Sequence, residues 1–367
     1  MSRVRLKHSV LILVLIIILS IPSSAFAGSS GIDYEYIDYI INIIDNFYIN
    51  DVSTDTHQTN IIKGLLNNLD KYTTYYTKEE YSKFMESMNG SFVGIGAYIK
   101  EENGEIVVAS TITGSNAEKA GLKSGDVIYA VDLKKTEGLD ADQVSSMIRG
   151  KEGTETKIYI RRDNIYKLFR IERTLININP VRYEVMNGSI GYIVLEDFTA
   201  EATYEVRRAL NYFDTKYIDD IVLDLRNNPG GYLDQAINIA RLFVPKGPIV
   251  NIKDNSGNIV RYDSYLDESK YNLVVLVNEN SASASEIVAA AVKDRGAGYI
   301  IGTKTFGKGS VQSLVQLPKG DGLKITIAEY FSPFMKKING VGVSPDLAIY
   351  NDLYDVQLEK ALEYFNR

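Results

Sequence analysis

A repeating order of apolar strands and amphipathic helices in the second half of the chain constrains the fold most. The pattern opens with a strand at 190–195 and a helix at 202–213. It continues with strands at 220–225, 273–277, 299–301 and 310–317 and with helices at 232–243 and 284–295. Alternation of this kind is typical of an α/β core. We therefore expect such a core over residues 176–350 and a terminal helix over 351–367.

The first half of the chain has a different character. Between residues 28 and 89, apolar residues such as Ile40, Ile43 and Phe47 recur at three- and four-residue steps, which predicts a segment of amphipathic helices. Glycines and short β-rich runs then take over, which predicts a separate and mostly β domain over residues 90–175. A chain of 367 residues also exceeds the roughly 250–300 at which a single core stops growing. We expect a multidomain α/β protein.

The N-terminus has the features of a secretory signal. Arg3, Arg5 and Lys7 precede an apolar run from Val10 to Leu19, and small residues lead up to Ala27. The alternative is a retained membrane anchor, but a span needs about 20 apolar residues and this run is shorter. We expect residues 1–27 to be a signal peptide and the protein to be secreted or extracytoplasmic in the cell envelope.

Composition excludes several classes of chemistry. The formal net charge is −7, so nucleic acid is not an expected partner. Without cysteine there is no thiol catalysis and no disulfide. Of the two histidines, His8 lies in the predicted signal and only His57 remains, which argues against a Ser-His-Asp triad and against a zinc site. We expect no metal and no cofactor.

Ser283 is the first candidate for catalysis. It follows an apolar strand and precedes an alanine-rich helix, so it stands where free N–H groups and the helix dipole favour a negative oxygen. Ser283 and Glu286 also spell a Ser-x-x-Glu capping box, so the alternative is a serine that only caps the helix.

Lys308 can supply the base that a serine nucleophile needs. Burial would hold its amine neutral by disfavouring the ammonium form. Gly307 and Gly309 allow close backbone approach, and Gln312 offers an amide to orient the amine. The alternative is an ordinary solvated lysine in a turn.

Two glycine segments are candidates for binding through backbone N–H groups. Gly230 and Gly231 follow a strand, and together with the N–H of Ala284 they are predicted to form an oxyanion hole. Ile95, Gly96 and Ala97 enter another strand, where their N–H groups can bind the terminal carboxylate of a peptide. Either segment alone is equally consistent with an ordinary turn.

In combination these segments resemble the carboxyl-terminal processing peptidases of family S41. Residues 281–287 resemble the nucleophile segment of that family, and residues 305–312 resemble its base segment, with the lysine 25 positions after the serine. Residues 224–231 are similar to its oxyanion segment, and residues 340–346 to the segment that closes its core. The resemblance implies a crotonase/Clp-like ββα superhelix as the protease core.

The middle domain resembles a PDZ module. The similarity lies in residues 94–97, 117–122 and 149–154. Asn116 stands where relatives usually carry proline, and Asp132 and Leu133 stand in place of the usual Asn-Gly turn. The resemblance implies that Ile95, Gly96 and Ala97 hold the carboxylate of a substrate tail.

The activity implied by this resemblance is that of a serine endopeptidase that cleaves proteins near their C-termini. Ser283 would be the nucleophile, Lys308 the base and Gln312 its orienting partner, while the PDZ domain captures proteins or peptides with free C-termini. One alternative is a non-catalytic PDZ adaptor on a peptidase-like shell, and another is an enoyl-CoA-type crotonase. The sequence leaves open whether two copies pair through the helical terminal segments.

Overall fold

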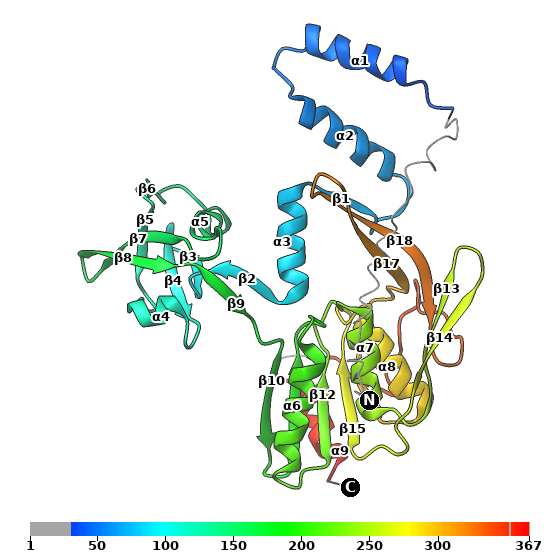
Figure 1. Cartoon of the computed structure of the whole chain (residues 1–367). Coiled ribbons are helices and arrows are strands. Elements are labelled where there is room, and N and C mark those ends of the chain that lie inside the picture. The colour runs from blue at the N-terminus through cyan, green and yellow to red at the C-terminus, as the bar shows by residue number, and fades with distance from the viewer. Residues whose placement is uncertain (1–30, 352–353, 367) are drawn as a thin grey trace, which may run out of the picture. The chain divides into compact units, whose positions relative to one another are not determined.

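The computed structural model describes residues 31–351 and 354–366, which divide into two compact units (Figure 1). One unit is Glu86–Asn179, where the sequence analysis placed a domain at 90–175, and the other combines the chain before it with the chain after it. The predicted signal lies outside the described residues. Within the described ranges, no helix is both long enough and apolar enough to span a bilayer.

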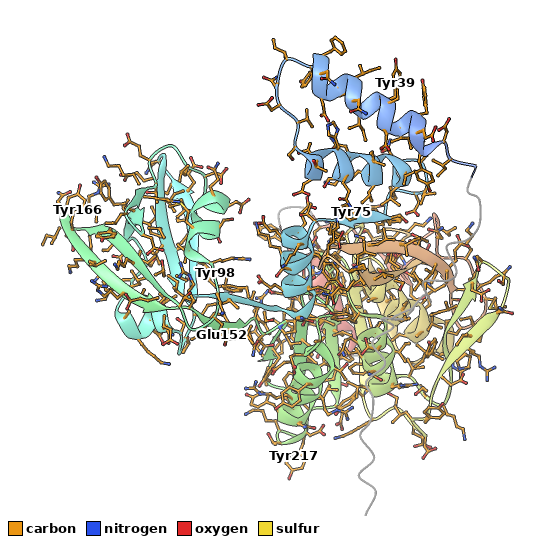
Figure 2. All side chains as sticks on the ribbon, turned by 45° about the horizontal axis from the view of Figure 1, so that its top comes forward. Tyr39, Tyr75, Tyr98, Glu152, Tyr166 and Tyr217 are labelled. Atoms are coloured by element: carbon orange, nitrogen blue, oxygen red, sulfur yellow. The ribbon has the colours of Figure 1, made fainter. Side chains whose placement is uncertain are left out.

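The N-terminal segment begins with two helices, α1 (Tyr34–Phe47) and α2 (Thr54–Leu66). They are joined by a hydrogen bond in which His57 Nε2 lies 2.8 Å from Asp45 Oδ1. Neither helix buries a residue, and Tyr39 of α1 is 61% exposed (Figure 2). The single histidine of the described residues therefore serves a helix–helix contact.

The segment continues through β1 (Thr74–Tyr76) into α3 (Lys78–Asn89), which leads into the second unit. β1 pairs with β18 (Gly322–Phe331) of the larger unit. The Tyr75 hydroxyl donates to Asp321 Oδ2 at 2.7 Å. The N-terminal segment is thus attached to the core by both strand pairing and a buried hydrogen bond.

The second unit is mostly β, as the sequence predicts. β2 (Ser91–Gly94) pairs with β9 (Thr174–Asn177). A second sheet contains β3 (Ala97–Glu102), β4 (Glu105–Thr111), β5 (Val127–Val131), β6 (Lys134–Lys135), β7 (Glu155–Arg162) and β8 (Ile165–Glu172), with helices α4 (Asn116–Ala120) and α5 (Ala141–Ile148). Alternate residues of β7, Ile158 and Ile160, are fully buried in its core. Asp140 and Gln143 form a capping box that fixes the start of α5.

The larger unit is built on a six-stranded sheet. Its order is β10 (Val181–Met186), β11 (Ile190–Leu195), β12 (Asp220–Asp224), β15 (Asn272–Val277), β16 (Tyr299–Gly302) and β19 (Leu347–Ala348). Only β10 runs antiparallel to its neighbour. Parallel strands of this kind are covered on both faces, which is why β15 is a continuous apolar run.

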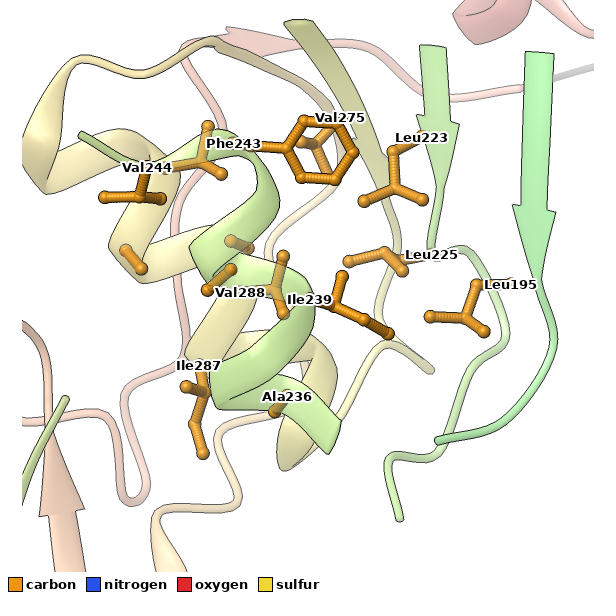
Figure 3. Close-up of a cluster of buried hydrophobic side chains, with 14 of the residues drawn as sticks. Leu195, Leu223, Leu225, Ala236, Ile239, Phe243, Val244, Val275, Ile287 and Val288 are labelled. Atoms are coloured by element: carbon orange, nitrogen blue, oxygen red, sulfur yellow. The ribbon is translucent and has the colours of Figure 1, made fainter. Parts of the chain in front are cut away.

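Helices cover the two faces of this sheet. Val275 and Val277 belong to the cluster that includes α6 (Ala202–Asp214), α7 (Leu233–Phe243) and α8 (Ala284–Arg295), part of which is drawn in Figure 3. Val274 and Leu276 belong to the cluster of α9 (Val356–Tyr364) on the other face. The side chains of β15 therefore alternate between two separate cores.

A five-stranded sheet completes this unit. It consists of β1, β13 (Gly247–Asp254), β14 (Ile259–Ser264), β17 (Ser310–Gln316) and β18. The sequence predicted only β17 of these strands. Most residues of β18 are half-buried and do not alternate between buried and exposed, so their burial does not separate one face of the strand from the other.

Candidate active site

Ser283 lies at the turn between β15 and α8. Its backbone is at φ 56° and ψ −111°, a conformation that a residue with a Cβ adopts only under strain. Its N–H donates to Glu286 Oε2 at 2.9 Å, and the N–H of Glu286 donates to the Ser283 carbonyl oxygen at 2.9 Å. No cap hydrogen bond of the Ser283 hydroxyl is formed at the start of α8. The hydroxyl is thus available for another role.

Glu286 joins this turn to the segment that carries Lys308. Its Oε2 accepts the N–H of Lys308 at 2.8 Å as well as that of Ser283. Its Oε1 accepts the Thr305 hydroxyl at 2.6 Å and the Gly307 N–H at 2.7 Å. The side chain is fully buried, and burial raises its pKa above the usual value for glutamate. The three N–H groups and the hydroxyl oppose this effect of burial, because each hydrogen bond that they donate favours the ionised carboxylate.

Tyr330, from β18, forms a second connection between the two segments. Its hydroxyl lies 3.0 Å from the Ser283 carbonyl oxygen and also contacts the Lys308 carbonyl oxygen. Tyr330 is almost completely buried, and burial raises the pKa of its hydroxyl well above 10. The hydroxyl therefore stays protonated and can donate to either carbonyl.

The Lys308 amine lies in a partly buried environment. Burial lowers its pKa below the usual 10.5, the charge of Lys324 lowers it further, and the carboxylate of Glu286 opposes both. Its Nζ lies 5.0 Å from the ring centroid of Tyr72, and no hydrogen bond from Nζ to Ser283 Oγ is found among the described residues. The structure therefore brings the two segments together without closing the Ser–Lys contact.

Gln312 does not contact Lys308 in this structure. Its Nε2 donates to Ser310 Oγ at 2.8 Å and to Thr326 Oγ1 at 3.3 Å. The Gln312 Oε1 accepts no hydrogen bond among the described contacts, so the expected orienting bond from the Lys308 amine could form there without breaking either of these two.

The glycine turn, which contains Gly230 and Gly231, lies directly against the turn of Ser283. A Cβ added to Gly230 would lie 2.7 Å from Ser283 Cβ and 3.1 Å from the Ala284 nitrogen. The Gly230 N–H already donates to Asn228 Oδ1 at 2.8 Å. No hydrogen bond among the described residues uses the N–H of Gly231 or of Ala284. Of the two glycines, only Gly231 has an N–H that no hydrogen bond among the described contacts uses.

A partly buried arginine connects the same turn to α9. Arg226 contacts Asp224 and also Asp355, with Nη1 2.6 Å from Asp355 Oδ1. Asp355 is the N-cap residue of α9, so the ion pair holds that helix beside the glycine turn. Sequence analysis did not identify Asp355, because the pairing joins residues far apart in the chain.

The predicted carboxylate-binding loop lies in the second unit, at the start of β3. Gly96 has φ 80°, and a Cβ there would lie 2.2 Å from Ser115 Cβ. The carbonyl oxygens of Ile95 and Gly96 accept hydrogen bonds from Ala117 and Ile112. Among the described contacts, no hydrogen bond uses the N–H of Ile95 or of Gly96. The loop thus fixes its carbonyl groups and leaves these two donors to a ligand.

Comparison with known proteins places the chain among peptidases. The model of peptidase family S41 matches residues 189–349, and a PDZ domain model matches residues 107–162. A probable CtpA-like serine protease of Staphylococcus aureus (strain bovine RF122 / ET3-1) is 36% identical over 323 residues, which are 87% of this chain and 65% of the relative. One of Staphylococcus epidermidis is 34% identical over 354 residues, 95% of this chain and 72% of the relative. The chain thus spans about two thirds of the length of these relatives.

Two solved peptidase structures are similar to this chain over most of its length. The photosystem II D1 C-terminal processing protease is 29% identical with a TM-score of 0.52, covering 89% of this chain and 90% of its own. A putative S41 protease of Bacteroides fragilis, 18% identical, has the same TM-score and covers 89% and 97% of the two chains. These matches confirm the predicted fold class, an α/β peptidase core with a PDZ domain. The chain belongs to peptidase family S41 and contains a PDZ domain.

Proposed function

We propose that this protein is a serine endopeptidase that cleaves other proteins near their C-termini, with Ser283 as nucleophile and Lys308 as base. The observation that carries the proposal is the Glu286 carboxylate, which accepts N–H groups from both residues and so holds a strained serine turn against a partly buried lysine. Family membership supports the same reading. His57 lies on α2, where it contacts Asp45, so lysine is the available base.

In the proposed mechanism, the neutral Lys308 amine takes the proton of Ser283 Oγ as that oxygen attacks the peptide carbonyl. The resulting ammonium donates the proton to the leaving amine, and an acyl-enzyme remains. Lys308 then takes a proton from a water molecule as the water oxygen attacks the ester, and the ammonium returns that proton to Ser283 Oγ as the product acid leaves. The lysine side chain has to turn from Tyr72 toward Ser283 before the first step.

The backbone N–H groups of Gly231 and Ala284 are the proposed oxyanion donors. Each has no other hydrogen-bond partner among the described contacts, and Gly230 packs against the turn that carries Ala284. One such donor is worth about 3 kcal/mol of transition-state stabilisation in serine peptidases. Gln312 is proposed to orient the lysine once the side chain has turned.

The PDZ domain is proposed to capture the free C-terminus of the substrate. Two features support this role: the N–H groups of Ile95 and Gly96 remain available, and β3 is an edge strand of its sheet. A peptide can add to such an edge while the loop binds its carboxylate. Ala97 is assigned the third position of this loop.

Turnover of an unstructured protein substrate tests the proposal. We expect cleavage by the wild type that is lost in Ser283→Ala and in Lys308→Ala and retained in Lys304→Ala, since Lys304 is exposed in the same segment. A substrate with an amidated C-terminus should be cleaved more slowly than one with a free carboxylate. Absence of wild-type turnover would overturn the proposal.

Ser281→Ala is a less suitable control because Ser281 has a structural role. Its hydroxyl donates to the Leu225 carbonyl at 2.7 Å and accepts the Asn278 N–H at 2.9 Å. The turnover rate of Ser281→Ala has to be corrected for the folded fraction of that variant, measured by denaturant unfolding, before it is compared with the rate of Ser283→Ala.

A non-catalytic PDZ adaptor is the second candidate, favoured by the open Ser283–Lys308 contact. An adaptor would bind the free C-terminal tail with the affinity of the wild type in both Ser283→Ala and Lys308→Ala, and no variant would release product. Calorimetric titration with a tail peptide, carried out beside the turnover assay, separates the two functions.

Pairing of two copies through the N-terminal helices is also proposed. Apolar side chains of α1 support it, since Phe47 is 83% exposed and Ile40 is 40% exposed. Sedimentation of the wild type and of Ile40→Asp tests it: a dimer should become a monomer, whereas a wild-type monomer at high concentration would refute it.

An extracytoplasmic location is proposed from the signal-like sequence at residues 1–27. The mass of the protein recovered outside the cytoplasm should correspond to a chain that begins at Gly28. A mass that includes the first residues would favour the retained anchor.

A further inference from the structure

Tyr72 is an aromatic residue in contact with the proposed base, and it comes from the N-terminal segment. The Lys308 Nζ lies 5.0 Å from its ring centroid, a cation–π distance. Among the described residues, no hydrogen bond is found for this amine, and Tyr72 is the aromatic ring that it contacts. The contact joins residues 236 positions apart in the sequence.

The loop that presents Tyr72 is held firmly. Asp70 Oδ1 accepts the N–H of Tyr72 at 2.7 Å and that of Thr73 at 2.9 Å, while Oδ2 accepts the Thr73 hydroxyl at 2.7 Å. Thr73 Oγ1 in turn accepts the N–H of Thr326 on β18 at 3.2 Å. The loop is therefore attached to the sheet that contains β17, the strand that follows Lys308 and begins at Ser310.

Charged groups from several elements face the Lys308 amine. Lys324 on β18 disfavours its charged form, and Glu286 on α8 favours it. Lys71 places its own amine 5.0 Å from the Tyr72 centroid and 5.3 Å from that of Phe306. The Tyr72 ring adds an attraction that exists only for the ammonium form, because the ring quadrupole acts on the charge.

We propose that Tyr72 is a positioning residue whose ring holds the Lys308 amine in a charged resting orientation, without a hydrogen bond to Ser283, until the base turns toward the nucleophile. The inference rests on the proposed function and deepens it. The N-terminal segment then limits the movement of the Lys308 side chain. A perturbation that moves the loop at residues 70–73 changes how readily this side chain leaves the Tyr72 ring and reaches Ser283.

Matched substitutions of Tyr72 separate the cation–π attraction of its ring from the exclusion of water around the Lys308 amine. Tyr72→Phe keeps the aromatic face, whereas Tyr72→Leu keeps an apolar cover without it. A cation–π contact of ordinary strength corresponds to about half to one pH unit. We expect the acidic limb of the kcat/KM profile to move down by that amount in Tyr72→Leu and to stay in place in Tyr72→Phe. Tyr72→Ala should move it up, because water that enters reduces the burial of the amine.

An NMR titration of the Lys308 side chain, assigned by its loss in Lys308→Met, gives the same comparison without turnover. Tyr129→Leu is the control, since Tyr129 has Lys135 Nζ at 5.8 Å from its ring in the other unit and should leave the titration unchanged. Identical midpoints in folded Tyr72→Leu and Tyr72→Phe would overturn the inference, and Tyr72→Met replaces the leucine variant if the latter is poorly folded. Failure of the proposed peptidase function would instead appear as a shifted midpoint with no turnover in any variant.

Discussion

Replacing Glu286 with glutamine changes one acceptor oxygen of the buried junction into an NH2 donor and leaves the volume almost unchanged. In the wild type, the two carboxylate oxygens serve four donors: the N–H groups of Ser283, Gly307 and Lys308 and the hydroxyl of Thr305. A glutamine can serve one pair with its carbonyl oxygen. Its NH2 then faces the other pair, in which at least one backbone N–H has no acceptor.

The expected loss follows from these contacts. The Thr305 hydroxyl can accept a hydrogen bond from the glutamine NH2 as well as donate one. A backbone N–H cannot accept, so the N–H of Gly307, or that of Ser283 or Lys308 in the other orientation of the amide, stays buried without a partner. Such a group costs about 1–3 kcal/mol, and the remaining hydrogen bonds lose the strength that the negative charge gives them. We expect Glu286→Gln to lower the free energy of unfolding by about 3 kcal/mol.

Equilibrium unfolding in urea measures this loss, with unchanged m-values as the condition for the comparison. Turnover should fall at least tenfold in the folded fraction, because the Ser283 turn and the Lys308 segment are no longer held by one group. The acidic limb of the pH profile should also move to lower pH, since the carboxylate that raises the pKa of Lys308 is gone. A variant within about 0.5 kcal/mol of the wild type, with an unshifted profile, would refute the reasoning.

Three further predictions concern single side chains of the two sites. Gly230→Ala should lower turnover at least a hundredfold in initial-rate assays, because the new Cβ would lie 2.7 Å from Ser283 Cβ at a φ of 109°; wild-type rates would exclude the close approach. Tyr330→Phe should lower the free energy of unfolding by about 1–2 kcal/mol in urea, since two carbonyl groups lose a buried donor, and an unchanged midpoint would contradict this. Gly96→Ala should weaken binding of a tail peptide at least tenfold by fluorescence anisotropy, because its Cβ would lie 2.2 Å from Ser115 Cβ; unchanged affinity would argue for another binding loop.

Local patterns predicted the elements whose ends are set by nearby residues. Helix α8 occupies the predicted range 284–295 and is ended by Gly296 in the left-handed conformation. The buried strand β15 begins one residue before its predicted range, since a run of branched apolar residues has few alternatives at that length.

Non-local contacts explain what the sequence did not predict. Tyr330 connects two carbonyl groups through strand pairing of β18, and Tyr72 reaches Lys308 from the start of the chain. No periodicity encodes either position, because each depends on a sheet assembled from strands far apart in sequence. Glu286 was identified only as half of a capping box, yet its carboxylate serves the base segment as well.

The surroundings of Lys308 act on the pKa of its amine in two opposite directions. The Glu286 carboxylate that fixes its backbone favours the ammonium form, and so does the Tyr72 ring. Burial and the charge of Lys324 favour the neutral amine that catalysis needs. Burial is the larger influence on this pKa, so a substrate that covers the site adds to it and favours the neutral amine further. Binding of a peptide would then supply part of the activation, and the acidic limb of kcat should lie at lower pH than that of kcat/KM.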